Sequence, residues 1–132
     1  MKQLTRSEAL EYWQDPSQQL YGLKLEDLPE PDENFAYFGV NNLAALVHAS
    51  FWPGVYMFHI GVKPEGRGEL KEESFELLYG VSDFYNAERL TTWVPSENRA
   101  ANAMAIRTGL TLGGKLKLKT MYINMYGWDK EG

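Results

Sequence analysis

Two histidines, His48 and His59, are the side chains of this 132-residue chain that change charge near neutral pH. His59 stands within the apolar run "VYMFHIGV". A histidine in such a run can transfer protons in catalysis, or it can pack in the core with one ring nitrogen hydrogen-bonded. The absence of cysteine excludes thiol nucleophiles, thiolate zinc sites and disulfides, and with two histidines we expect no transition-metal site.

A second candidate stretch is "WVPSENRAANAMAIRTGL", residues 93 to 110. Asn98 is a favourable N-cap residue, and Gly109 is a favourable end, so the stretch predicts a short helix. Its alanines fill the faces of the helix with little volume. We therefore expect another group to approach this helix closely, and Asn98 to serve either as a simple cap or as a ligand of that group.

The N-terminal part predicts helical and irregular structure. Ser7 is the expected N-cap of a short helix that ends at Asp15-Pro16, and residues 17–23 predict a second helical turn. Residues 24–34 hold five carboxylates and two prolines, which is typical of an acidic, solvated loop.

The next part has the period of two that is typical of strands. Apolar runs at 35–40, 43–52 and 55–62 are separated by Asn41-Asn42 and Pro53-Gly54, which predicts an antiparallel meander joined by tight turns. The third run is almost entirely apolar, so we expect both of its faces to be covered.

The C-terminal part predicts a strand-helix-strand unit and a final pair of strands. A helix is expected up to Tyr85, with four glutamates near its positive end, and a strand over 89–94 follows. Such a unit normally makes a right-handed parallel crossover. After the alanine-rich helix, residues 110–118 and 120–128 predict two more strands, so that the fold class is α+β with one parallel step.

Composition limits the classes of function. The formal charge of −5 disfavours a nucleic-acid-binding protein, which needs concentrated Lys and Arg. No apolar run approaches the roughly 20 residues of a membrane span, and residues 1–13 lack the apolar core of a signal peptide. We expect one domain, residues 1–132, in the cytoplasm.

The order of these elements, together with two short motifs, resembles the GNAT superfamily of N-acetyltransferases across essentially the whole chain. One motif is "VKPEGRG", similar to the V-x-P-E-x-R-G of the family at the end of the fourth strand; the other is Asn98 followed eleven residues later by Gly109-Leu110. The resemblance implies a mixed, mostly antiparallel central sheet of about six to seven strands with a splayed parallel pair, flanked by about four helices.

The resemblance also implies a site for acetyl-CoA. Its pantetheine arm would lie along the backbone of Ile60, Gly61 and Val62 and accept a hydrogen bond from, or donate one to, Asn98. Its pyrophosphate would lie at Arg67 and Gly68, beside the amide groups at the start of the following helix.

Three positions depart from the family pattern. Leu70 and Glu72 stand where the phosphate loop of the family has glycines, and the nearby glutamates would repel a polyanion. Ala105 stands where many members carry the tyrosine that protonates the leaving thiolate. The likeness is therefore to the fold more than to the active site.

Two residues are catalytic candidates. Tyr56 stands where some relatives carry a general-base glutamate, although a tyrosine with a pKa of about 10 is a poor base near neutral pH. His59 titrates in the right range but lies on the opposite face of its strand. The acidic loop at 24–34 corresponds to a segment that walls the acceptor site in the family, and its carboxylates would suit a cationic amine.

Two functions from different classes follow. The first is an acetyl-CoA-dependent N-acetyltransferase that acts on a small amine or a peptide amine. The alternative is a catalytically inactive GNAT-like bacteriophage protein that acts in head assembly or DNA ejection through protein binding, in the cytoplasm of the host. The residues leave open whether the protein is an enzyme and whether it forms a homodimer.

Overall fold

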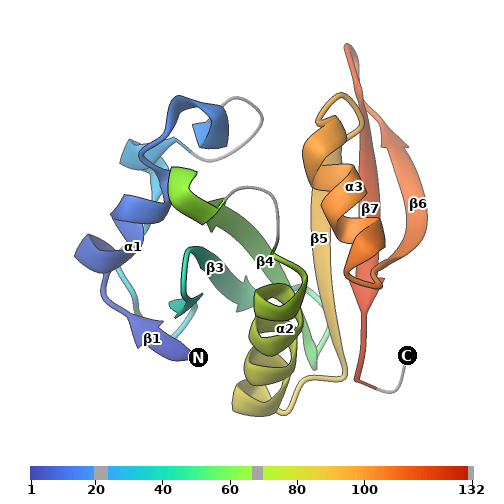
Figure 1. Ribbon diagram of the computed structural model, residues 1–132. Coiled ribbons are helices and arrows are strands. Elements are labelled where there is room, and N and C mark those ends of the chain that lie inside the picture. Colours follow the sequence, from blue (N-terminus) through green and yellow to red (C-terminus); the bar gives the residue numbers. More distant parts are fainter. Residues whose placement is uncertain (20–23, 67–69, 131–132) are drawn as a thin grey trace.

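The computed structural model describes residues 1–19, 24–66 and 70–130, and these residues form one mixed sheet with helices on both faces (Figure 1). The seven strands are ordered β1-β2-β3-β4-β5-β7-β6. Their bounds are Lys2–Leu4 (β1), Phe35–Val40 (β2), Leu43–Ala49 (β3), Val55–Val62 (β4), Arg89–Pro95 (β5), Thr111–Lys117 (β6) and Tyr122–Trp128 (β7).

Helices connect and cover this sheet. The α-helices are α1 (Arg6–Trp13), α2 (Lys71–Tyr85) and α3 (Arg99–Arg107). Three short 3-10 turns lie in the connections, namely η1 (Pro16–Gln19), η2 (Leu25–Asp27) and η3 (Pro64–Gly66). The described residues thus hold three α-helices, against the approximately four that the sequence predicts.

All neighbouring strands are antiparallel except β4 and β5, which are parallel. The mixed α+β sheet, the meander β2-β3-β4 and the single parallel step are therefore confirmed. Turn chemistry explains the meander, because Asn41 and Gly54 adopt the left-handed backbone conformation, with φ of 52° and 81°. The edge strand β1 was not predicted, because its three residues are too short to show a period.

The first helix begins two residues earlier than predicted. Thr5, not Ser7, is its N-cap: the Thr5 side chain accepts a hydrogen bond from the Glu8 amide, and the Glu8 side chain accepts one from the Thr5 amide. This reciprocal capping box satisfies two amide groups at once, whereas Ser7 would satisfy one.

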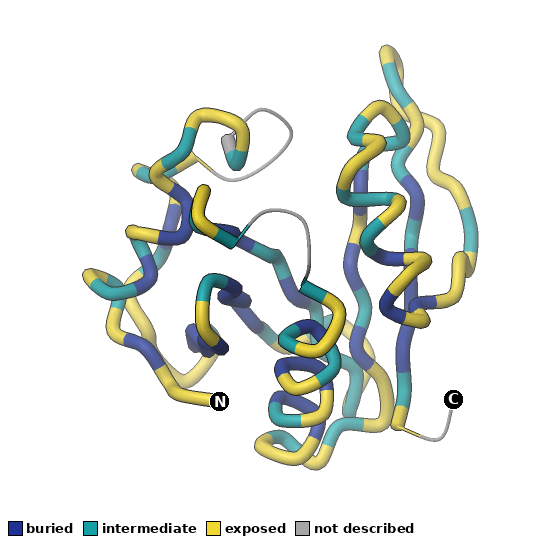
Figure 2. The backbone as a smooth tube through the Cα atoms, viewed as in Figure 1, coloured by how far each residue is buried: buried dark blue, intermediate teal, exposed yellow. Residues whose placement is uncertain are grey.

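Two cores form on the two faces of the sheet. The larger core joins the sheet to α2 and α3 and includes Phe38, Phe58 and Val81. The smaller core joins the opposite face to α1 and includes Trp13 and Tyr37. Figure 2 shows the buried residues along the inner strands, whereas the edge strand β6 is mostly exposed.

Strand β4 is covered on both faces near its C-terminal end, as its apolar sequence predicts. Phe58 and Val62 lie in the larger core. On the other face the Trp13 ring lies directly on Gly61, so that a Cβ atom added there would come within 2.5 Å of the indole. Glycine at this position therefore permits α1 to pack closely on the sheet.

We expect Gly61→Ala to lower the free energy of unfolding by about 1–3 kcal/mol, because the added methyl group displaces a buried indole. Gly113→Ala is the matched control, since its new Cβ atom would meet no described atom closer than 3.6 Å. Urea unfolding followed by Trp fluorescence measures both variants. An equal effect of the two substitutions would contradict this account of the Trp13 contact.

Candidate functional site

The parallel strands β4 and β5 are paired along only part of their length. Their ladder holds three residue pairs and ends at Met57–Thr91. Just past it, the Thr92 hydroxyl donates a buried hydrogen bond of 2.8 Å to the Phe58 carbonyl oxygen. The strands then diverge (Figure 1), as expected for a splayed parallel pair.

The direction of the β4 backbone determines which peptide groups face this divergence. The hydrogen bonds from Lys63 N to Asn42 O (3.0 Å) and from Ser50 N to Val55 O (2.9 Å) show that the odd-numbered residues of β4 direct their amide and carbonyl groups toward β3. Gly61, which is paired with Ala44, belongs to this set. Its backbone therefore does not lie along the open edge, where the sequence analysis places it.

The even-numbered residues of β4 direct their backbone groups toward the divergence. The Val62 amide donates a hydrogen bond of 3.0 Å to Gln18 Oε1, so a side chain of the N-terminal segment already engages it. Ile60 lies between Val62 and the end of the β4–β5 ladder. Of the three predicted contact residues, Ile60 and Val62 thus direct their backbone groups toward the place where β5 has left, and the amide of Val62 is already bonded to Gln18.

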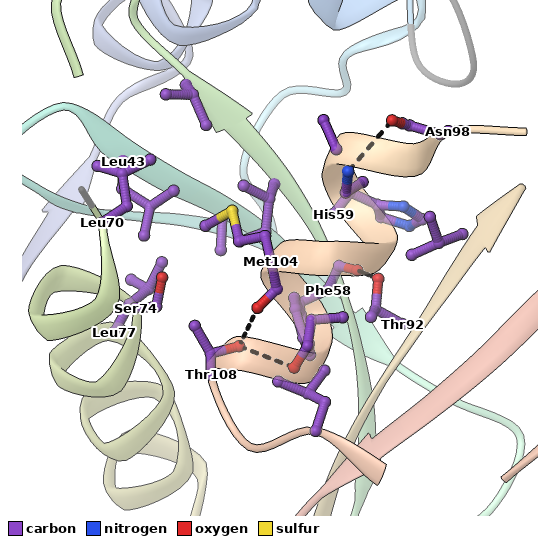
Figure 3. Close-up of a pocket in the computed structure, with 18 of the residues that line it drawn as sticks. Leu43, Phe58, His59, Leu70, Ser74, Leu77, Thr92, Asn98, Met104 and Thr108 are labelled. Carbon is purple, nitrogen blue, oxygen red and sulfur yellow. Dashed lines mark hydrogen bonds between the residues drawn. The ribbon is translucent and has the colours of Figure 1, made fainter. Parts of the chain in front are cut away.

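A cavity of about 1040 Å³ lies over the divergence, between α2 and α3 (Figure 3). Its α3 wall consists of residues spaced three or four apart, which places them on one face of that helix. They are Asn98, Ala101, Met104, Ala105 and Thr108. The small side chains of Ala101 and Ala105 leave room in the cavity, which accounts for the alanine-rich composition of this helix.

The α2 wall of the cavity follows the same spacing and includes Lys71, Ser74 and Leu78. The N-cap residue of α2, Leu70, makes no side-chain capping bond, so among the described residues its side chain leaves the first amide groups of the helix without a cap. The Ser74 hydroxyl is buried and has no hydrogen-bond partner among the described residues. Figure 3 shows Ser74 on the side of α2 that faces the cavity.

The charges at the cavity are mainly positive. Among the described residues, Lys71, Arg99 and Arg107 line it, together with the single carboxylate of Glu97. Glu72, which the sequence analysis expects to repel a polyanion, lies in the first turn of α2 but is exposed and does not line the cavity. The predicted phosphate-contact residues Arg67 and Gly68 lie outside the described residues.

Asn98 caps α3 and also lines the cavity. Its Oδ1 accepts a hydrogen bond of 3.2 Å from the Ala101 amide, which is the capping interaction that the sequence predicts. The Asn98 carbonyl oxygen accepts a second bond, from Asn102 Nδ2 at 2.8 Å. The capping role of Asn98 is therefore present, and its role toward a ligand remains a prediction.

Asn102 does not line the cavity but holds its α3 wall in place, a role that the sequence did not predict. Besides its bond to Asn98, its Nδ2 donates to the Pro95 carbonyl, and its Oδ1 accepts bonds from Asn124 Nδ2 (2.8 Å) and the Tyr126 hydroxyl (2.6 Å). These bonds fix α3 to β7. The sequence did offer one signal, an asparagine inside a predicted helix. Its side chain competes for the hydrogen bonds of the helix backbone and is unfavourable there unless it has other partners.

The two predicted catalytic residues lie in different surroundings. The Tyr56 ring stacks on Tyr85, with centroids 4.4 Å apart, and Tyr56 does not line the cavity. His59 does line the cavity. Because His59 alternates with Phe58 along β4, its side chain belongs to the α1 face, and it reaches the cavity at the divergence of the strands.

His59 is paired with the other histidine. The rings of His48 and His59 are stacked with centroids 5.3 Å apart, and their Nε2 atoms are 3.2 Å apart. Burial, and to a lesser extent the neighbouring His48 ring, lower the pKa of His59 from 6.5 to about 4. His59 is therefore neutral near pH 7, and the lowered pKa makes it a weaker base than a free imidazole.

The acidic loop does not line the cavity. All five of its carboxylates are exposed, as in the simpler interpretation of a solvated connection. Asp32 is used locally, because its Oδ1 accepts hydrogen bonds from the amides of Asn34 and Phe35. The expected role of the acidic loop at an acceptor site remains a prediction.

Within residues 1–19, 24–66 and 70–130, no group of three or more histidine and acidic side chains is arranged to hold a metal ion. In the same ranges, none of the helices combines the length and the apolar composition required to cross a membrane.

Comparison with solved structures gives similar proteins at low sequence identity. A variant of the spermidine N-acetyltransferase SpeG from Vibrio cholerae superposes with a TM-score of 0.72 at 13% identity, over 96% of this chain and 91% of that one. The ribosomal-protein-S5-alanine acetyltransferase from Vibrio fischeri superposes with a TM-score of 0.69 at 11% identity, over 96% and 90%.

A third structure contains a cofactor. The Microcin C7 self-immunity acetyltransferase MccE, in complex with acetyl-CoA and AMP, superposes with a TM-score of 0.51 at 18% identity, over 64% of this chain and 53% of that one. No family model and no curated protein matches the sequence. The structural likeness shows that the chain has the GNAT fold, which confirms the predicted resemblance at the level of the fold.

The Thr92 hydroxyl gives a first test of the site. We expect Thr92→Val to lower the free energy of unfolding by about 1–3 kcal/mol, because it keeps the shape of the side chain but leaves the buried Phe58 carbonyl without this donor. Thr91→Val is the matched control, since the Thr91 hydroxyl lies 3.5 Å from the Tyr56 carbonyl and is only partly buried. If urea unfolding gives the same loss of unfolding free energy for both variants, the Thr92 hydrogen bond does not stabilise the structure at the point where the strands diverge.

The pKa of His59 gives a second test. Because the folded-state pKa of about 4 is below the ordinary value of 6.5, the unfolded chain binds more protons between these values, and stability must rise with pH across that window and level off above it. The difference corresponds to ~3 kcal/mol. Carboxylates titrate there too, so the comparison is with His59→Gln, whose stability should rise less steeply. Parallel curves of stability against pH for the two proteins would show that the pKa of His59 is not lowered in the folded protein.

Proposed function

We propose that the protein is an acetyl-CoA-dependent N-acetyltransferase that acts on an amine, with His59 as its general base. One observation carries the proposal most: the Ile60 backbone faces the divergence of β4 and β5, directly beneath a cavity that the start of α2 and the small side chains of α3 enclose. The GNAT fold and the acetyl-CoA complex of MccE support the choice of cofactor. The spermidine and ribosomal-protein acetyltransferases support an amine acceptor.

The residues at the cavity fit acetyl-CoA. Peptide groups such as those of Ile60 can pair with the amides of a pantetheine arm as an added strand would. The first amide groups of α2, which the Leu70 side chain does not cap, and the cationic Lys71 suit a phosphate group. The unpartnered Ser74 hydroxyl offers one more hydrogen bond inside the cavity.

When bound, acetyl-CoA supplies the thioester carbonyl that an amine attacks. Of the two predicted catalytic residues, His59 is the one that lines the cavity, so we assign to it the proton that the amine must lose. The chain offers no tyrosine at Ala105, and the Thr108 hydroxyl is directed at the carbonyl oxygens of Met104 and Ala105. We therefore assign the proton of the thiol product to His59 as well.

Isothermal titration with acetyl-CoA tests the proposal. We expect micromolar binding by the unmodified protein and binding at least roughly tenfold weaker by Ala101→Leu, because the larger side chain fills the α3 wall of the cavity. Ala103→Leu is the matched control, since Ala103 is on the same helix but exposed and outside the cavity. Acetylation of spermidine and of an N-terminal alanine peptide, followed by mass spectrometry, then tests the acceptor class.

The absence of heat with acetyl-CoA at millimolar concentration would reject the enzyme proposal. The alternative, a GNAT-like bacteriophage protein that binds other proteins in head assembly or DNA ejection, would then be favoured. One surface feature supports it: Phe51 and Trp52, at the turn between β3 and β4, are 100% and 67% exposed.

A further inference from the structure

The two histidines belong to a row of rings that crosses three neighbouring strands. Phe35 of β2 is the direct partner of His48 on β3, and their rings are 5.5 Å apart at an angle of 49°. His59 of β4 follows on the other side of His48, with an interplanar angle of 18°. His48 is therefore held between two rings on the α1 face of the sheet, and its own ring contacts the one that lines the cavity.

The hydrogen bonds of His48 determine where its proton lies. Its Nδ1 is 3.1 Å from the Ala49 carbonyl oxygen, and because a carbonyl oxygen can only accept, Nδ1 carries the hydrogen. In the neutral form of His48 this is the single N–H group of the imidazole, so Nε2 then carries no hydrogen.

The proton position on His48 then fixes that on His59. The bare Nε2 of His48 lies 3.2 Å from Nε2 of His59, so this contact is a hydrogen bond only if His59 carries its proton on Nε2. In that tautomer Nδ1 of His59 is the nitrogen without a proton. A hydrogen bond on one ring nitrogen commonly determines the role of the other in this way.

We propose that His48 is a positioning residue, which holds His59 in the Nε2–H tautomer so that Nδ1 is the atom that accepts a proton from the amine. The inference rests on the proposed function. As the bond from the amine nitrogen to the acyl carbon forms and the carbon–sulfur bond breaks, the electron pair of the broken bond leaves with sulfur. The amine proton moves to Nδ1 of His59 and passes afterwards to the sulfur, which gives the thiol.

The hydrogen bond persists through this step. His59 keeps its Nε2–H when Nδ1 is protonated, so His48 remains its acceptor and orients the charged ring. Among the residues that the structure describes, the other charged side chains that line the same cavity are Lys71 on α2, Arg99 and Arg107 on α3, and Glu97 before α3. Because His48 is the side chain whose Nε2 contacts Nε2 of His59, we expect it to influence the pH profile most directly.

Long-range nitrogen–proton NMR correlation on histidine-labelled protein, without cofactor and near neutral pH, tests the tautomers. The expected result is an Nδ1–H tautomer for His48 and an Nε2–H tautomer for His59. In His48→Leu, which lacks an acceptor, His59 should become a mixture of both tautomers, and His48→Gln, whose side-chain oxygen can accept, should restore Nε2–H. An Nδ1–H tautomer of His59 in the unmodified protein, or no change in His48→Leu, would overturn the inference.

Kinetics tests the consequence for catalysis. His48→Leu should lower kcat roughly 10- to 100-fold, leave the Kd for acetyl-CoA unchanged and shift the pH midpoint of kcat, with partial recovery in His48→Gln. Unchanged acetyl-CoA binding also shows that the variant is folded. If the unmodified protein shows the expected tautomers but acetylates no amine, the proposed function fails and the catalytic use of the pair fails with it. If acetylation occurs with the other tautomer, only the inference about His48 fails.

Discussion

The site depends on one hydrogen bond at the point where β5 turns away from β4. There the Thr92 hydroxyl donates to the Phe58 carbonyl oxygen, in place of the peptide amide that would have continued the ladder. A regular parallel ladder would pair the Ile60 backbone and close the sheet. Because the hydroxyl satisfies the Phe58 carbonyl at the point of divergence, the strands separate without leaving that buried group unpaired. The same opening lets His59, on the α1 face of the sheet, reach a cavity that lies on the α2 and α3 face.

Much of the fold could be predicted because its signals are local. Alternating apolar residues and the turns at Asn41 and Gly54 indicate the meander, and a strand-helix-strand order indicates the parallel step. Two features of the fold could not be predicted from the sequence, and in both cases the reason is physical. Strand β1 is too short to show a period, and the choice of Thr5 over Ser7 depends on a reciprocal bond with Glu8 that single-residue preferences do not weigh.

The site was less predictable because its parts depend on register. Whether the backbone of Gly61 or Ile60 faces the open edge is decided by the pairing of β4 with β3, which composition does not reveal. The contact between His48 and His59 likewise requires two strands to be aligned, although the residues are eleven positions apart. Asn98 could be predicted as a cap from its own helix, whereas the role of Asn102 required β7 to lie beneath it.

The brevity of the β4–β5 ladder has a mechanical consequence. Strands β1 to β4 form one plate with α1, and strands β5, β7 and β6 form a second plate, to which the amide of Asn102 fastens α3. Within the described sheet, three residue pairs make the seam between the plates. A small rotation about this seam would widen or narrow the cavity while every other strand ladder stays intact. The packing of the larger core, which includes Phe58 of the first plate and Val94 of the second, therefore sets the width of the cavity.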